Sequence, residues 1–176
     1  GEAATAALQP EDPAELQTAS KQIRGWFSEG VLSPDITGAL REAYASLGQP
    51  PVAVRSSATA EDLPEMSFAG QQDTYLNITD PQAVLEATRK CWASLWTARA
   101  IGYRARQKIA PEGVALAVVI QELVFADAAG ILFTANPING QRDQMMVSAS
   151  WGLGEAVVGG LVTPDSLTLE KSSGKV

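Results

Sequence analysis

Residues 52–78 read VAVRSSATAEDLPEMSFAGQQDTYLNI, and this stretch guides the interpretation of the whole chain. An apolar strand runs into one arginine, a group of small hydroxyl residues, two acidic residues and then a glycine followed by two glutamines. A connection that only reversed the chain would need a few residues, such as Asn-Gly. About twenty irregular residues inside a compact domain are typical of a functional loop.

The first half of this loop carries groups that bind anions. Arg55 follows the strand, and its planar guanidinium can hold two phosphate oxygens in parallel hydrogen bonds. Three hydroxyl residues lie within the next four positions and add short donors. A structural alternative stays open, in which Arg55 pairs with Glu61 or Asp62 and the hydroxyls satisfy turn amides.

The second half of the loop, SFAGQQDT, is organised around a glycine. Gly70 indicates a backbone that takes a positive φ or closely approaches another group. The N–H groups after it, with the Thr74 hydroxyl, are typical of a flap over a polyphosphate. The alternative is that Gly70 only makes a bend, and spacing alone does not decide between the two.

Two helices are predicted ahead of the strand, where they serve as packing elements. Apolar residues at near-helical spacing place the first helix over residues 13–28. Ser33 and Pro34 give the second helix an N-cap followed by proline, and Gly48 with the prolines beyond it ends that helix.

Strands, one long helix and further strands complete the predicted fold. We expect strands over residues 51–54 and 73–78, and a continuous helix from Asp80 to Ile109. Four later segments also have the apolar character of strands: residues 114–124, 129–137, 144–150 and 166–171. The pattern favours an α+β fold with a mixed, mainly antiparallel sheet and packing helices. We divide it into a helical front segment, 1–50, and a core, 51–176.

The last third of the long predicted helix is basic, with Arg99, Arg104, Arg106 and Lys108. Contact with phosphate is one interpretation of these cations. The helix macrodipole alone also favours cations near a helix C-terminus, so we assign them no ligand.

Composition excludes several classes of function. The net charge of −7 argues against a non-specific nucleic-acid binder, which needs a broad cationic face. With no histidine and one cysteine, the chain cannot hold a Ser-His-Asp triad, a Cys-His pair or a usual zinc site. Cys91 lies among apolar residues, which indicates a buried thiol. No apolar run reaches the length of a membrane span, so we expect a cytoplasmic protein without membrane contact.

Several motifs occur in a fixed order and carry a family resemblance. The loop motif is followed by KCWASLWTARAIGYR, VVIQELV, GILFTANP and WGLGEAVVGGLVTPD. From Pro51 to Lys171 the chain resembles the ATP-binding domain of the dikinase family. That family contains phosphoenolpyruvate synthase (pyruvate, water dikinase), pyruvate phosphate dikinase and rifampicin phosphotransferase.

The resemblance implies an ATP-grasp-like fold in which ATP is clamped and Mg²⁺ neutralises its phosphates. It further implies that ATP gives its β,γ-diphosphate to a histidine on a separate domain, releasing AMP. The resulting phosphohistidine would phosphorylate pyruvate or another acceptor. By motif position, Arg55 is the catalytic and phosphate-gripping arginine. Gly70 and Thr74 correspond to glycine-loop contacts and Gln121 to an adenine-side residue, with no metal ligand assigned.

Three polar residues each have two possible roles. Gln121 is expected within a buried apolar strand, where an adenine edge would satisfy its amide; a neighbouring loop is the other candidate partner. For Glu122, a salt bridge and a contact with the nucleotide are equally compatible with the sequence. Glu155 lies in the glycine-rich WGLGEAVVGG, which is either a second phosphate-side loop or a site of close sheet packing.

The resemblance also implies that this is a partial domain of a larger enzyme. Family members carry a phosphate-binding lysine before the front helices, and acidic, glutamine and arginine residues after the last strand. The expected partners are ATP, a phosphohistidine domain and an acceptor-binding domain of the same full-length chain. An isolated fragment is then expected to be inactive. The alternative is a degenerate or regulatory ATP-binding module without catalysis of its own.

Overall fold

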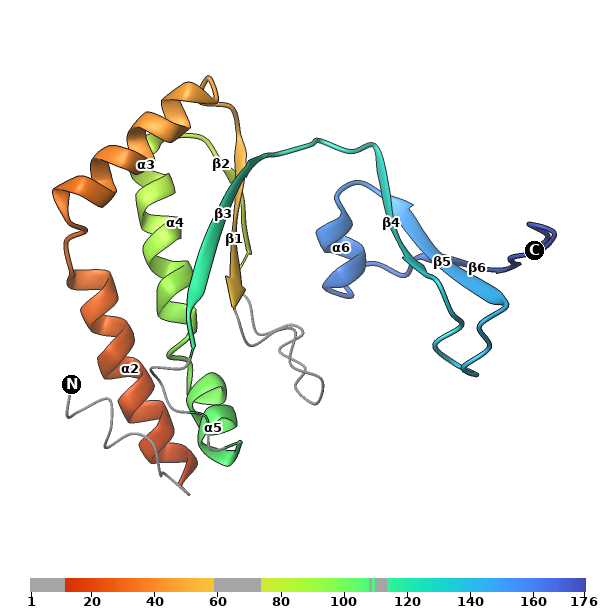
Figure 1. Ribbon diagram of the computed structural model, residues 1–176, viewed down its shortest axis with the longest axis horizontal. Helices are drawn as coiled ribbons and strands as arrows, with labels where there is room; N and C mark the ends of the chain where they lie inside the picture. Colours follow the sequence, from red (N-terminus) through yellow and green to blue (C-terminus); the bar gives the residue numbers. More distant parts are fainter. Residues whose placement is uncertain (1–11, 59–73, 108, 110–113) are drawn as a thin grey trace. The chain divides into compact units, whose positions relative to one another are not determined.

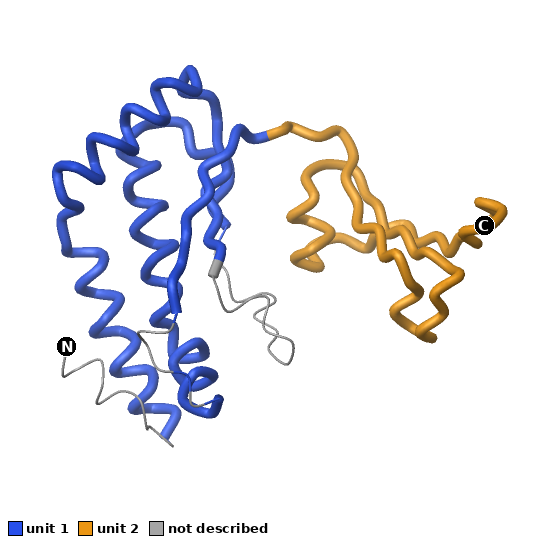
Figure 2. The backbone as a smooth tube through the Cα atoms, viewed as in Figure 1, with its two compact units in different colours: residues 1–123 blue, residues 124–176 orange. Residues whose placement is uncertain are grey.

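The structure is a computed structural model that describes residues 12–58, 74–107, 109 and 114–176. The chain forms two compact units, residues 1–123 (unit 1) and residues 124–176 (unit 2), as Figure 2 shows. Each unit has its own three-stranded sheet (Figure 1). The division after residue 50 was drawn from motif content, and as a division of function it stays a prediction.

The first two helices of unit 1 begin at side-chain caps, of which the Ser33 cap was predicted from the sequence. Helix α2 spans Pro13–Glu29, and the Asp12 carboxylate accepts a hydrogen bond from the Ala14 N–H (2.8 Å). Helix α3 spans Pro34–Ser46, where the Ser33 hydroxyl accepts from the Ile36 N–H. Both predicted helices are confirmed. In Figure 1 they lie on the same side of the sheet as α4, against which both pack.

The sheet of unit 1 has the strand order β2-β1-β3. Strand β1 (Val52–Ala58) is central and pairs antiparallel with both β2 (Thr74–Ile78) and β3 (Leu116–Glu122). The pairing of β1 with β3 is regular along all seven residues of β1. The polypeptide therefore returns to the same sheet after two helices, which brings residues far apart in sequence into direct cross-strand contact.

The core of unit 1 lies between this sheet and helix α4 (Pro81–Ser94). Its fully enclosed members are Tyr44, Val52, Val54, Val84, Ala87 and Cys91. The predicted burial of the Cys91 thiol is confirmed. Each fully buried valine of this set contributes about 1.5–3 kcal/mol through burial of its side chain. One face of the sheet is therefore committed to packing.

The predicted continuous helix over residues 80–109 is wrong, because the helix breaks near its middle. Helix α4 ends at Ser94, and helix α5 spans Ala98–Arg106. Between them Thr97 adopts an extended conformation, and its hydroxyl accepts from the Ala100 N–H (3.2 Å). A threonine that caps a new helix in this way interrupts a run whose apolar spacing alone favoured continuity.

Asp80 is the strongest side-chain cap in this region, and its removal gives the first prediction. Its Oδ1 accepts hydrogen bonds from the N–H groups of Gln82 and Ala83, both at 2.9 Å. Asp80→Ala is expected to lower the free energy of unfolding by about 1 kcal/mol, the usual cost of losing an N-cap. Urea denaturation measures this loss. Asp80→Asn keeps an acceptor oxygen and should retain most of the stability; an equal loss in both variants contradicts the capping role.

Unit 2 is a second antiparallel sheet with the strand order β4-β5-β6. Its strands are β4 (Ala128–Phe133), β5 (Gln144–Trp151) and β6 (Asp165–Glu170), and the short helix α6 (Gly154–Val158) packs on β4 and β5. Gly130 permits a close approach, since a Cβ there would lie 2.8 Å from the Ser148 carbonyl oxygen.

The α+β class and the antiparallel pairing are confirmed, but the single mixed sheet is wrong. Two separate sheets form, and all strand pairs among the described residues are antiparallel. The reason is that β3 pairs with β1 along its full length, so that β3 belongs to unit 1 and not to the later strands. No helix in the described part of the chain is long and apolar enough to cross a membrane.

Candidate functional site

The two faces of the unit 1 sheet differ sharply. Val52, Val54 and Ser56 of β1 are buried on the face that packs against α4, whereas on the other face Arg55 and Ser57 are exposed and only the small Ala53 is buried. Side chains alternate between faces along a strand. Arg55 and Ser57 therefore define a second face, which we call the open face.

Arg55 lies at the centre of a cross-strand row on the open face. Its partners in register are Thr74 on β2 and Val119 on β3. Residues directly opposite one another in an antiparallel pair project from the same face, with Cα atoms about 4.5–5.5 Å apart. A cationic, a hydroxyl and an apolar side chain are thus neighbours in this row.

Gln121 lies in the adjacent row of the same face. It pairs with Ala53, two residues from Arg55 along β1. Two residues along a strand correspond to about 7 Å. The structure therefore brings together three of the four predicted site residues, Arg55, Thr74 and Gln121, whereas Gly70 lies outside the described residues.

A bulge in β2 adds a further residue to the open face. Between the pairs Val52–Ile78 and Val54–Tyr75, Ala53 faces two β2 residues, Leu76 and Asn77. Asn77 takes a positive φ of 57°, which asparagine tolerates better than most residues. Tyr75 and Ile78 pack against the core, so the alternation from Thr74 places the half-buried Leu76 on the open face.

The environment expected for Gln121 is wrong. The sequence predicted a buried strand, but β3 is an edge strand on which Gln121 and Glu122 are both exposed. Residues 116–120 alternate between half-buried and exposed positions, because only one face of the sheet is covered by helices. Gln121 therefore needs no buried partner, and its amide is accessible to a ligand.

The acidic residues considered in the sequence lie in different parts of the chain. Glu61 and Asp62, the proposed ion-pair partners of Arg55, lie outside the described residues. Glu155 is exposed in the first turn of α6, so its glycine-rich segment forms a helix and a turn and not an extended loop. Its role stays open, as does that of Glu122.

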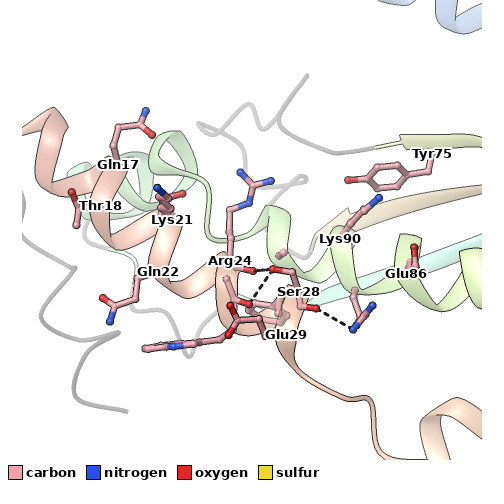
Figure 3. Close-up of a pocket in the computed structure, with 16 residues that line it drawn as sticks. Gln17, Thr18, Lys21, Gln22, Arg24, Ser28, Glu29, Tyr75, Glu86 and Lys90 are labelled. Carbon is pink, nitrogen blue, oxygen red and sulfur yellow. Dashed lines mark hydrogen bonds between the residues drawn. The ribbon is translucent and has the colours of Figure 1, made fainter.

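A groove on the helical side of unit 1 does not contain the predicted residues. It has a volume of about 1340 Å³ and is lined by α2, α4 and Tyr75 of β2 (Figure 3). Two of its cations have structural contacts: the Arg89 guanidinium donates to the Gly30 carbonyl (2.7 Å), and the Lys90 ammonium lies 5.6 Å from the centre of the Tyr75 ring. These contacts tie α4 to the end of α2 and to the sheet.

Arg104, one of the four cations named at the end of the predicted long helix, is buried. It is 2% exposed, and its guanidinium lies over the Trp96 ring at 5.2 Å. Its Nη1 has no hydrogen-bond partner among the described residues, and desolvation lowers the pKa of the group. The sequence signal was the apolar character of Ala100 and Ile101, which share the buried side of α5 with Arg104.

The described residues do not gather the ligands of a metal site. In this part of the chain no group of three or more His, Cys, Asp or Glu side chains is placed to hold an ion. What the open face provides is a guanidinium, an amide and a hydroxyl around apolar side chains, which is the chemistry of a site for a polar ligand with an anionic group.

A two-unit α+β chain with such a face defines a candidate nucleotide-binding domain, and comparison with known proteins gives its family. Residues 2–176 match the family described as pyruvate phosphate dikinase, AMP/ATP-binding domain. The chain belongs to this family, as the motif resemblance indicated.

The similar proteins include enzymes with two different names, and all are much longer than this chain. A probable phosphoenolpyruvate synthase of Pyrococcus horikoshii is 46% identical over 172 residues, covering 94% of this chain and 21% of the relative. A rifampicin phosphotransferase of Streptomyces sviceus is 51% identical over 159 residues, covering 90% of this chain and 18% of the relative. A probable phosphoenolpyruvate synthase of Methanothermobacter thermautotrophicus is 47% identical over 175 residues, covering 96% and 25%. The chain thus spans about a fifth of these relatives' length.

Proposed function

We propose that this chain is the nucleotide-binding part of an ATP-dependent dikinase, and that ATP binds on the open face of the β2-β1-β3 sheet. The observation that carries the proposal is the register, which places Arg55, Thr74 and Gln121 on one face. Membership of an AMP/ATP-binding family supports a nucleotide as the ligand. The larger fold is then ATP-grasp-like, with this sheet as one wall of the clamp.

Each residue has a distinct chemical task in this proposal. The Arg55 guanidinium forms charge-assisted hydrogen bonds with phosphate oxygens and stabilises the charge that develops during phosphoryl transfer. The Thr74 hydroxyl, in the same row, adds a donor. The Gln121 amide supplies one acceptor and two donor hydrogens, which suit the edge of an adenine base. Gly70 lies outside the described residues, and the motif resemblance alone assigns it to the phosphate site.

The complete reaction needs groups outside this chain. The β,γ-diphosphate of ATP passes to a histidine on another domain, AMP leaves, and the phosphohistidine phosphorylates pyruvate or another acceptor. The chain contains no histidine, so it cannot be the phosphoryl carrier. The acceptor is selected elsewhere in the full-length protein, which agrees with relatives that are named as phosphoenolpyruvate synthases and as a rifampicin phosphotransferase. The isolated fragment is accordingly inactive in the complete reaction.

Magnesium enters the proposal with the nucleotide. Mg²⁺ bound to ATP neutralises phosphate charge, and proteins often hold it through substrate phosphates with one or two carboxylates. The described residues do not by themselves build a magnesium site, so no step is assigned to the ion here.

Backbone amide NMR during titration with Mg-ATP tests the proposal. Saturable shifts concentrated on residues 54–57, Thr74 and Gln121, with little change along α2, are the expected result. The same titration with inorganic triphosphate should move the Arg55 region and leave Gln121 nearly unchanged. Absence of saturable shifts at millimolar Mg-ATP, or shifts confined to the α2–α4 groove, contradicts a nucleotide site on the open face.

A further inference from the structure

An exposed apolar side chain lies next to Arg55 in the proposed site. Val119 is 44% exposed, although it is a β-branched residue in the middle of β3. It lies directly opposite Arg55 and two residues before Gln121 on the same face. Neither the loop motif nor the resemblance assigns this residue a role.

The open face combines polar and apolar side chains in two neighbouring rows. Leu76, Ala53 and Gln121 form one row, and the next row contains Thr74, Arg55 and Val119. The aliphatic members Leu76, Ala53 and Val119 are neighbours across the two rows, with the Gln121 amide beside them. Ala53 is only 4% exposed, so Val119 and the half-buried Leu76 supply the accessible apolar surface. Such a surface matches a ligand that has a flat apolar ring joined to an anion.

An apolar protein surface is a poor occupant of this position. Covering Val119 would also cover Arg55, because the two Cα atoms lie only about 4.5–5.5 Å apart across the strands. Burial of an unpaired guanidinium is strongly unfavourable. A nucleotide avoids this cost, since its phosphates pair with the cation while its base removes the valine side chain from water.

We propose that Val119 is a positioning residue that supports the face of the nucleotide base, with Leu76 extending the same platform. This inference rests on the proposed function, and it specifies how the site distinguishes a nucleotide from a free polyphosphate. The base lies over Val119 with its edge toward Gln121. The phosphates extend toward Arg55 and Ser57, both of which are exposed on the same face.

Substitution of Val119 separates base recognition from phosphate recognition. Val119→Ala removes two methyl groups and is expected to weaken Mg-ATP binding about five-fold, the effect of roughly one lost methylene-sized contact. Binding of inorganic tripolyphosphate should change by less than about two-fold, because that ligand has no base to support. Val119→Ile keeps a branched platform and should restore Mg-ATP affinity. Calorimetric titration of the intact chain measures all three.

Two further variants make the outcomes distinguishable. Val31→Ala is the matched control, because Val31 is 96% exposed and lies in the α2–α3 connection; it should change neither affinity. Arg55→Ala should weaken both ligands. Suppose that Arg55→Ala weakens binding of both ligands, whereas Val119→Ala weakens binding of both equally or of neither. The role of Val119 as a platform is then overturned, and the proposed function stands. If Arg55→Ala leaves Mg-ATP binding unchanged, or the wild-type chain shows no saturable binding, the proposed site itself is overturned and the platform with it.

Discussion

Arg55→Ala is expected to weaken Mg-ATP binding by about 1.5–3 kcal/mol, or roughly 10- to 150-fold, while the free energy of unfolding changes little. The loss is large because each hydrogen bond from a guanidinium to phosphate is charge-assisted. Stability is spared because the side chain is exposed on the open face and is no part of the core. Titration calorimetry and urea denaturation of the same protein preparation measure the two quantities.

Arg55→Lys is the informative companion to this variant. Lysine keeps the charge but loses the planar fork that holds two oxygens at once, so its affinity should fall between wild type and Arg55→Ala. A drop in melting temperature without loss of affinity would instead identify Arg55 as a structural ion-pair residue. That outcome would favour the alternative in which Glu61 or Asp62 is its partner.

The local structure of unit 1 was largely predictable, because its signals are short-range. Ser33-Pro34 and Asp80-Pro81 are caps that act within one turn of the chain, and α3 and α4 begin where these pairs occur. The helix break at Thr97 was not predicted, although it too depends on a short-range cap. The free energy that favours a threonine cap over continuation of the helix is small, and the apolar periodicity of the surrounding residues indicated a continuous helix.

Long-range pairing was less predictable than local structure. The sequence of β3 does not specify whether it pairs with β1, about sixty residues earlier, or with the β-like segments that follow it. This pairing also decides which residues share a face. The sequence indicated Arg55, Thr74 and Gln121 separately, but their common face and the position of Val119 opposite Arg55 depend on register.

Side-chain burial was the least predictable property. Gln121 was expected inside and is exposed, because its strand lies at a sheet edge. Arg104 was grouped with three other cations near the end of the predicted helix, and it is buried because α5 turns that side toward the interior. Both differences arise from the tertiary position of an element, and residue type alone does not encode it.

Arg104 gives the second prediction with a large effect. Its guanidinium is desolvated, stacks on Trp96 and has an unpartnered Nη1 among the described residues. Arg104→Met is expected to raise the free energy of unfolding by about 1–4 kcal/mol, since replacement of a buried charge by an apolar side chain of similar length removes the desolvation penalty. Methionine also retains contact with the aromatic ring.

Denaturation followed by tryptophan fluorescence is suited to this measurement, because three of the four tryptophans, Trp26, Trp92 and Trp96, belong to unit 1. Arg106→Met is the matched control: Arg106 is exposed in the last turn of α5, and its replacement should change stability by less than about 0.5 kcal/mol. Arg104→Ala should destabilise, since it also removes the packing on Trp96. A loss of stability in Arg104→Met comparable to that in Arg104→Ala would contradict the prediction, because it would mean that the buried guanidinium itself, and not only its packing, holds α5 in place.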